Sequence, residues 1–247
     1  MNTIDIVIPT MWCDEDFIPT LEKYCDYSSV GKIILIDNQK SKRPNHNILQ
    51  NSKIELVSYN KNIYVNPAWN EGYYRSSADV IAVLNDDIFV DEKLFTIIQS
   101  LDISNIDIIG SCLRGTSSNY EIQDNYYEEE QLVKLELNKK RPIGEQSYAF
   151  GVCMFIKRSS YKPIPSLYKI WFGDDYIVQR CNDVYVFKTN YITGKISKTV
   201  SNSTIENLDK RITLDAHNAY HYKHFKNVQN WEVVVHSMNS KKYEKFY

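Results

Sequence analysis

The chain has 247 residues, 43% of them hydrophobic and 24% charged, with a formal net charge of -2. This composition is that of a globular protein long enough for one large α/β domain or two small ones. The near-neutral charge excludes an overall electrostatic attraction to nucleic acid or to an anionic membrane surface, so we expect no nucleic-acid partner.

The five cysteines are scattered and form no CxxC pair, which argues against a disulfide framework and a structural zinc site. The first residues carry no basic leader, and no run approaches the ~18 apolar residues of a transmembrane segment. We therefore expect a cytoplasmic protein without a membrane span.

The first 110 residues alternate short apolar runs with amphipathic segments. Apolar runs predict strands at 4–8, 32–36, 54–57, 80–84 and 106–109. Helices are expected between them: one after an acidic start at 14–16, one N-capped by Asn66 and ending near Ser77, and one beginning near Asp91. This alternation predicts a doubly wound α/β fold with a parallel sheet. Neither GxGxxG nor GxxxxGK[ST] occurs at the defining positions, which excludes the dinucleotide-binding and P-loop classes.

The second half is less regular. Residues 111–146 are polar and predict a long loop or an inserted excursion, which could be either a lid or binding loop or a surface insertion. After it we expect a strand at 148–156, a helix at 176–181, a strand at 184–187 and a helix at about 205–225. His217, His221 and His224 would share a face of that last helix, but without HExxH we interpret them as a partly exposed helix face rather than a metal site.

An acidic turn follows the fourth predicted strand directly, at Asn85, Asp86 and Asp87. Ligands of open α/β sheets bind at the carboxyl ends of the strands. Adjacent carboxylates in such a place favour a hard divalent cation that holds substrate phosphates. The same residues are also good turn and N-cap chemistry before the next helix. Taken alone, this segment leaves both interpretations open.

Four segments in this order resemble the GT-A-fold glycosyltransferases, particularly the family 2 type. They are IVIPT at 6–10, ILIDN at 34–38, NIYVNPAWNEG at 62–72 followed by LNDD at 84–87, and FGDDYIVQR at 172–180. The resemblance covers about residues 4–225. It implies a single GT-A domain over 1–247, with a Rossmann-like, mixed, mainly parallel sheet flanked by helices. Residues 1–110 would be the nucleotide-binding half and 111–230 the acceptor-binding and catalytic half, followed by a C-terminal tail.

The resemblance also implies roles for individual residues. In such enzymes the acid that closes the second strand, here Asp37, hydrogen-bonds the base of the nucleotide. The last carboxylate of the DXD motif, here Asp87, binds Mn²⁺ or Mg²⁺ on the donor diphosphate. The later acidic pair, Asp174 and Asp175, is catalytic, and its second member is the general base. The implied nucleotide-sugar-binding residues are Pro9, Thr10, Trp12, Asp37, Asn38, Asn62, Asn66, Asn70, Asn85, Asp86 and Lys198.

Three residues depart from the family pattern. Asn85 replaces the first acid of the DXD motif, which weakens metal binding without excluding it. Tyr64 stands where the family often has glycine, so the local loop must differ. Lys198 stands where many relatives carry a histidine that contacts metal or diphosphate, and a lysine there could offset the diphosphate charge directly.

The resemblance therefore implies an inverting, metal-dependent hexosyl- or deoxyhexosyltransferase. It would move a sugar from a UDP-, GDP- or dTDP-sugar to a hydroxyl of a glycan or glycoconjugate, with the metal on the leaving diphosphate and a carboxylate base at the acceptor. The acceptor site is expected at 111–146 or 168–172. The alternatives are a nucleotidyltransferase, although the turn at 9–16 is acidic and lacks glycine, and a non-catalytic nucleotide- or sugar-binding module.

Overall fold

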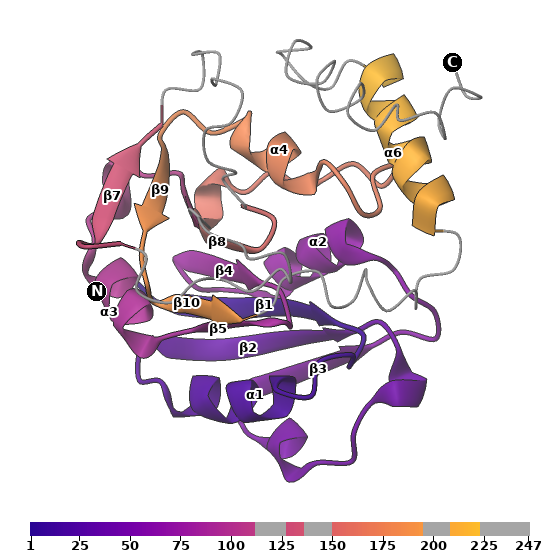
Figure 1. The fold of residues 1–247 in the computed structure, drawn as a ribbon, viewed down its shortest axis with the longest axis horizontal. Helices are drawn as coiled ribbons and strands as arrows, with labels where there is room; N and C mark the ends of the chain where they lie inside the picture. The colour runs from indigo at the N-terminus through magenta and orange to yellow at the C-terminus, as the bar shows by residue number, and fades with distance from the viewer. Residues whose placement is uncertain (112–126, 136–149, 195–207, 223–247) are drawn as a thin grey trace.

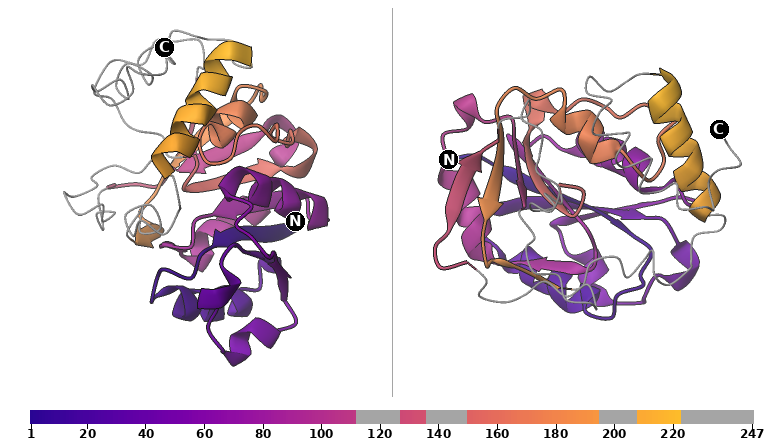
Figure 2. Two further views of the ribbon diagram at one scale, coloured as in Figure 1. Left: turned by 90° about the vertical axis from the view of Figure 1, so that its right-hand side faces the viewer. Right: turned by 45° about the horizontal axis from the view of Figure 1, so that its top comes forward.

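A computed structural model describes residues 1–111, 127–135, 150–194 and 208–222 (Figure 1). A mixed sheet runs through this part of the molecule, with strand order β3-β2-β1-β4-β8-β6-β9-β7. Helices pack on both of its faces. In both views of Figure 2, α6 in yellow lies on the same side of the sheet as α4 in orange.

The described elements are listed here in chain order. The first part contains β1 (Ile4–Thr10), α1 (Phe17–Asp26), β2 (Val30–Asp37), β3 (Ile54–Ser58), α2 (Val65–Arg75), β4 (Val80–Leu84), β5 (Ile88–Val90) and α3 (Glu92–Ser100). The second part contains β6 (Ile108–Ser111), β7 (Gln131–Lys134), β8 (Cys153–Lys157), α4 (Gly173–Val178), β9 (Val184–Lys188), β10 (Ile192–Gly194) and α6 (Leu208–Tyr222). Short 3₁₀ turns lie at Lys40–Lys42, Asn47–Gln50, Ile103–Asn105 and Arg158–Ser160.

The sheet is mainly parallel but not wholly so. Strands β3, β2, β1 and β4 are parallel neighbours, and β6 is parallel to β9. Strand β8 lies antiparallel between β4 and β6, and β7 is antiparallel to β9 at the edge. Strands β5 and β10 form a separate small antiparallel pair. The expected mixed, mainly parallel sheet is confirmed.

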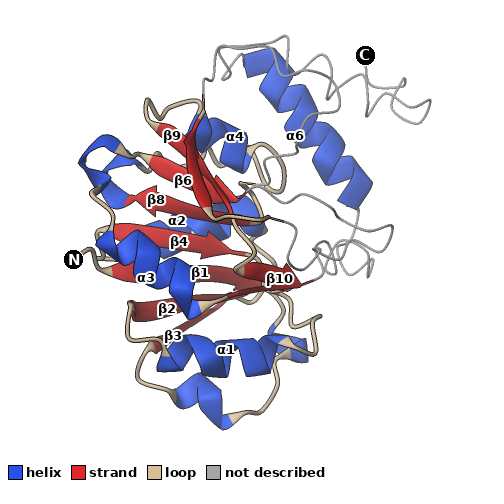
Figure 3. Cartoon of the chain, turned by 60° about the vertical axis from the view of Figure 1, so that its left-hand side comes forward, coloured by secondary structure: helices blue, strands red, loops and turns tan. Residues whose placement is uncertain are grey.

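Alternation along the central strands divides the core into two layers. Val7 on β1 faces a cluster that includes residues of α2, α4 and α6, whereas Ile6 and Ile8 face a cluster that includes residues of α1 and α3. This follows because successive side chains of a strand point to opposite faces. Figure 3 shows α3 in front of the sheet and α2 behind it. Both faces of the central strands are buried, as their continuous apolar runs predict.

Helix α2 lies unusually close to the sheet. A Cβ atom at Gly72 would collide with the side chain of Val7 on β1. Only glycine therefore allows this approach. The contact sets the height of α2 above the carboxyl end of β1, where the candidate site lies.

Besides small shifts at β2 and β6, three predicted boundaries near the site are wrong. Helix α2 begins at Val65 rather than after an Asn66 cap, because Tyr64 adopts a left-handed φ of 69° and supplies no side-chain cap. Helix α4 begins at Gly173, since Phe172, with φ 70°, turns the chain three residues earlier than expected. Residues 150–152 form a turn, so β8 starts only at Cys153, and 148–149 lie outside the described residues.

Three short strands were not predicted. Strand β7 occupies 131–134 of the polar stretch that we expected to be a loop, and its pairing with β9 depends on residues far away in sequence. Strands β5 and β10 have only three residues each and pair across about 100 residues of chain. Within the described part of the chain, no helix is both long and apolar enough to cross a membrane.

Candidate functional site

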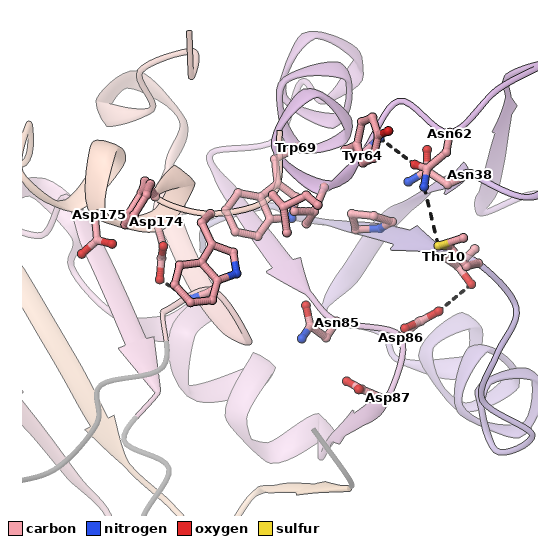
Figure 4. A pocket seen from close by; sticks show the side chains of 17 residues that line it. Thr10, Asn38, Asn62, Tyr64, Trp69, Asn85, Asp86, Asp87, Asp174 and Asp175 are labelled. Atoms are coloured by element: carbon pink, nitrogen blue, oxygen red, sulfur yellow. Dashed lines mark hydrogen bonds between the residues drawn. The ribbon is translucent and has the colours of Figure 1, made fainter. Parts of the chain in front are cut away.

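A cavity of about 390 Å³ lies at the carboxyl ends of the central strands (Figure 4). Its size is in the range of small-molecule binding sites. The lining residues come from both halves of the chain: Pro9, Thr10, Met11, Asn38, Asn62, Tyr64, Val65, Trp69, Asn85, Asp86, Asp87, Gly151, Ile170, Trp171, Phe172, Asp174 and Asp175.

The floor of the cavity is a hydrogen-bonded link between the ends of β1 and β4. Thr10 Oγ1 donates to Asp86 Oδ2 at 2.7 Å, and the backbone N–H of Trp12 donates to Thr10 Oγ1 at 2.9 Å. Burial raises the pKa of Asp86 to about 6, and the hydrogen bond from Thr10 opposes that rise. Asp86 therefore holds the turn at the end of β1 in place.

Asp37 at the end of β2 does not line the cavity. It is fully buried and accepts from Trp12 Nε1 at 2.8 Å, the N–H of Gln39 at 3.0 Å and Ser58 Oγ at 3.2 Å. The Arg43 guanidinium lies 3.4 Å from its second oxygen. Both carboxylate oxygens are thus engaged inside the protein. Trp12 also stays outside the lining, and its indole supports Asp37.

Two asparagine side chains line the cavity beside this turn. Asn38 Oδ1 accepts from the N–H of Ile63 at 3.1 Å, and Asn62 Oδ1 accepts from the N–H of Tyr64 at 2.7 Å. Figure 4 shows the two amide groups side by side above Thr10. Each amide is oriented by a backbone donor.

Asn66 and Asn70 do not line the cavity, and their side chains instead bind the backbone of the segment on its other side. Asn66 Nδ2 donates to the carbonyl of Trp171 at 2.9 Å. Asn70 exchanges two hydrogen bonds with the backbone of Ile164, each 2.8 Å long, and accepts from the hydroxyl of Tyr161 at 3.0 Å. The two asparagines are one helical turn apart on α2. Together they anchor residues 164–171, the segment that carries Trp171, to this helix.

The acidic turn after β4 lies at the lower edge of the cavity in Figure 4. The N–H of Asn85 donates to the carbonyl of Val152 at 3.0 Å, and Asp87 is only 4% exposed. A Cβ atom at Gly194 would lie 2.6 Å from the Asp87 carbonyl oxygen, so β10 packs directly on this turn. The turn is therefore rigidly placed.

Asp174 and Asp175 lie on the opposite side of the cavity from this turn (Figure 4). Both belong to the first turn of α4. Asp174 Oδ2 accepts from the N–H of Gly151 at 3.0 Å, and burial raises the pKa of its carboxyl. Asp175 is the more exposed of the two and also lines the cavity. The two acidic pairs of the sequence thus meet across one space.

A buried carboxylate on α6 organises the segment that leads into α4. Asp215 is fully buried and accepts backbone N–H groups from Lys169 at 3.0 Å, Ile170 at 2.7 Å and Trp171 at 3.0 Å. Burial raises the pKa of Asp215, and these hydrogen bonds oppose that rise. Sequence reasoning missed this residue. Its signal was an acid among the apolar positions 212, 216 and 219 of one helix face.

One wall of the cavity is aromatic, formed by Tyr64, Trp69, Trp171 and Phe172. The indole nitrogen of Trp69 is buried and donates to none of the described residues. Among the described residues other than glycine, positive φ occurs at Trp12, Tyr64 and Phe172; Tyr64 and Phe172 line the cavity, and Trp12 follows Met11 of the lining. Strained backbone of this kind persists only where its surroundings hold it, and it gathers at functional sites.

The lining is strongly acidic. Asp86, Asp87, Asp174 and Asp175 contribute carboxyl groups, and none of the lining residues that the structure describes is lysine, arginine or histidine. No group of three or more potential metal-ligating His, Cys, Asp or Glu side chains occurs in the described part of the chain. The residues therefore fit a cation whose coordination a bound phosphate ligand completes, and not a metal held by protein alone.

Most of the expected site residues come together in this cavity, and Trp12, Asp37, Asn66 and Asn70 lie behind it and support it. Met11, Val65 and Trp69 also line it and belong to the segments 10–12 and 62–72 that the motifs indicate, whereas Gly151 lines it without having been predicted. Lys198, His224 and the side chain of His221 lie outside the described residues, and His217 is exposed on α6.

No protein-family model matches the sequence, and no curated protein matches it. Solved structures match its fold. Residues 1–349 of S. aureus TarS align with a TM-score of 0.57 at 11% identity, over 94% of this chain and 75% of that one. The same fragment in complex with UDP-GlcNAc gives 0.59 at 11%, over 89% and 67%. HddC from Yersinia pseudotuberculosis complexed with GMP-PN gives 0.52 at 17%, over 77% and 92%. The chain has the GT-A-like fold expected from its motifs.

Proposed function

We propose that this chain is an inverting glycosyltransferase that moves a sugar from a nucleotide diphosphate sugar to a hydroxyl acceptor. The observation that carries the proposal is the placement of two acidic sites, 85–87 and 174–175, across one cavity of a GT-A-like fold. Sugar transfer needs one site that stabilises a leaving diphosphate and another that removes a proton from the acceptor. The complex of the TarS fragment with UDP-GlcNAc supports a nucleotide-sugar donor.

The acidic turn would hold the donor diphosphate through a divalent cation. Diphosphate is anionic, and the described lining offers carboxylates without a basic side chain, so a cation is needed between them. Asp87 would be the main protein ligand, with the Asn85 amide beside it, for Mn²⁺ or Mg²⁺. When bound, such an ion neutralises the charge that develops on the departing diphosphate.

Asp175 would act as the general base from the other side of the cavity. It would take the proton of the acceptor hydroxyl as that oxygen attacks the anomeric carbon on the face opposite the diphosphate, which inverts the configuration. Asp174 accepts a hydrogen bond from the backbone N–H of Gly151 and would position α4. Trp171 offers a flat apolar surface on which a sugar ring can lie.

The donor would be a UDP-, GDP- or dTDP-hexose or -deoxyhexose, and the acceptor a glycan or glycoconjugate. The acceptor would enter beside 168–172, the segment that Asp215 holds in place.

Replacing the proposed base tests this function. Asp175→Asn should lower transfer, measured with a panel of nucleotide sugars and Mn²⁺, at least ~100-fold. It should leave the donor Kd within about threefold, because it removes a proton acceptor and not a donor contact. Asp26→Asn, which changes an exposed carboxylate on α1, is the matched control. Wild-type transfer rates in Asp175→Asn would contradict the assignment.

Nucleotidyl transfer is the second candidate, because the fold also matches HddC complexed with GMP-PN over 92% of that chain. The turn at 9–16 argues against it, since it is acidic and offers neither glycine nor a basic side chain for a triphosphate. Release of pyrophosphate from a nucleoside triphosphate and a sugar phosphate would favour this candidate. Donor binding without any turnover would instead favour a non-catalytic module.

A further inference from the structure

A short turn at residues 150–152 lies between the two acidic sites. Strand β8 runs antiparallel to β4, with Cys153 opposite Leu84. This register brings the residue before β8 beside the residue after β4, and the N–H of Asn85 donates to the carbonyl of Val152 at 3.0 Å. The turn therefore borders the acidic turn that begins at Asn85.

The other side of the turn at 150–152 contacts α4. The N–H of Gly151 donates to Asp174 Oδ2 at 3.0 Å. A Cβ atom at Gly151 would lie 3.1 Å from the same oxygen, so a side chain there would press on the carboxylate. Gly151 and Asp174 both line the cavity, and Figure 4 shows Asp174 and Asn85 on opposite sides of it. One short piece of chain thus connects the two acidic sites.

The residues of this turn are held in different ways. Phe150 is 3% exposed, and a Cβ atom at Gly110 would lie 2.4 Å from its ring, so the ring packs on β6. Gly151 has no side chain to pack, and glycine has the widest choice of backbone conformations. The hydrogen bond to Asp174 restricts that choice, because it fixes the direction of the Gly151 N–H.

From these contacts we infer that Asp174 is a positioning residue for the acidic turn as well as for α4. Through residues 150–152 it holds Asn85 and the acidic turn in place. The proposed metal ligand Asp87 thus keeps its position relative to the proposed base Asp175. The inference rests on the proposed function and adds a coupling between its two acidic sites.

This coupling matters because sugar transfer needs both sites at once. The acceptor oxygen attacks from the side of Asp175 while the diphosphate departs toward the cation at Asp87, so the spacing between the two acids must suit the donor. A misplacement of ~1 Å in such an arrangement can cost ~100-fold in rate. A hydrogen-bonded connection through the backbone keeps this spacing without a further side chain in the cavity.

The coupling makes a prediction that a role on α4 alone does not. If Asp174 positioned only α4, its replacement would change turnover and leave cation-dependent binding of the diphosphate intact. Because it also holds the acidic turn, its replacement weakens that binding, although Asp174 lies on the other side of the cavity.

The test is a set of calorimetric titrations of UDP, dTDP and GDP into the full chain, each in Mn²⁺ and in EDTA. Asp174→Ala removes both the charge and the acceptor of the Gly151 N–H, whereas Asp174→Asn removes the charge and keeps an oxygen. For the nucleotide that wild type binds most tightly in Mn²⁺, the Kd of Asp174→Ala should exceed that of Asp174→Asn at least fivefold. In EDTA the two values should agree within twofold or both fall below detection. Equal Kd values in Mn²⁺, or a fivefold difference that persists in EDTA, would overturn the inference.

A double-mutant cycle with Asp87→Ala locates the effect. The difference between Asp174→Ala and Asp174→Asn in Mn²⁺ should shrink to less than twofold when Asp87 is already replaced, because the cation has then lost its main ligand. A full fivefold difference in that background would overturn the inference. Asp174→Leu fills the space of the carboxylate without an acceptor, and it takes the place of Asp174→Ala if melting temperatures show that the alanine variant is unfolded.

Asp107→Ala and Asp107→Asn are the matched controls. Asp107 also accepts backbone N–H groups, from Asn182 at 2.7 Å and Asp183 at 3.0 Å, but it lies outside the lining of the cavity. Both control variants should bind the nucleotide as wild type does. If Asp174→Ala loses nucleotide-sugar turnover and keeps the Kd of Asp174→Asn in Mn²⁺, only this inference fails. If wild type binds no nucleoside diphosphate in Mn²⁺, the proposed function fails with it.

Discussion

Replacing Asp215 by asparagine should loosen the segment that carries the aromatic wall. The carboxylate accepts three backbone N–H groups, from Lys169, Ile170 and Trp171, and is fully buried. Asparagine keeps one oxygen, which can still serve Ile170 and Trp171 and, at 3.1 Å, Lys169. The negative charge is lost, and the NH₂ group replaces the oxygen that accepts from Lys169 at 3.0 Å.

The expected cost follows from these contacts. A hydrogen bond to a charged group contributes ~1.5–3 kcal/mol, whereas a neutral one contributes about 1 kcal/mol, and three backbone donors lose the charged acceptor. Asp215→Asn should therefore lower the free energy of unfolding by about 3 kcal/mol. If residues 169–171 detach from residue 215 before the whole protein unfolds, the measured loss of unfolding free energy is smaller, and Trp171 then leaves the cavity wall. Either result lowers kcat/KM.

Urea denaturation gives the stability, and nucleotide-sugar turnover gives kcat/KM. Lys210→Ala, an exposed change on the same helix, serves as the control and should match wild type in both assays. The reasoning would be refuted if Asp215→Asn unfolded within about 0.5 kcal/mol of wild type, the range of ordinary surface substitutions, and kept its kcat/KM.

Three further predictions concern single residues. Because burial raises the pKa of Asp86 to about 6, the folded state binds its proton more tightly than the unfolded chain. The free energy of unfolding should therefore fall by about 3 kcal/mol as pH rises from about 3 to about 7, relative to Asp86→Asn, and urea titrations that show no such slope would contradict this. Gly72→Ala should lower the free energy of unfolding by ~1–3 kcal/mol, because the added Cβ atom collides with Val7. At an open helix position the same change would raise stability, so a higher urea midpoint in Gly72→Ala would contradict the close contact. Asp87→Ala should raise the Kd of UDP at least tenfold with Mn²⁺ but leave it unchanged in EDTA, and equal loss in both would argue against a metal ligand.

The central strands were predictable because burial on both faces leaves an unmistakable apolar run. Residues 80–84 form β4 as expected, and Asp91 caps α3 through its side chain. The short strands β5 and β10 were not predictable, since their pairing depends on residues about 100 positions apart. The start of α2 was missed because nothing local indicates that Tyr64 adopts a positive φ.

The candidate site was predictable in its acids and less so in its supports. Motif order alone predicts that Asp87 and Asp175 face one site, and both line the cavity. The engagement of Asp37 by Trp12 could not be predicted, because it depends on a left-handed turn at Trp12 and on the side chains of Ser58 and Arg43. Asp215 was missed because a single acid on an apolar helix face has no motif.

Turnover of nucleotide sugars with and without a divalent cation tests the proposed function most directly. Wild-type protein is incubated with a panel of UDP-, GDP- and dTDP-sugars in Mn²⁺ or in EDTA, and the nucleoside diphosphate released is measured. We predict release from at least one donor in Mn²⁺ and at least a tenfold lower rate in EDTA, because the described lining of the cavity is acidic and without a basic side chain. No release from any UDP-, dTDP- or GDP-sugar in Mn²⁺ would contradict sugar transfer, and equal rates in both solutions would contradict the role given to the cation.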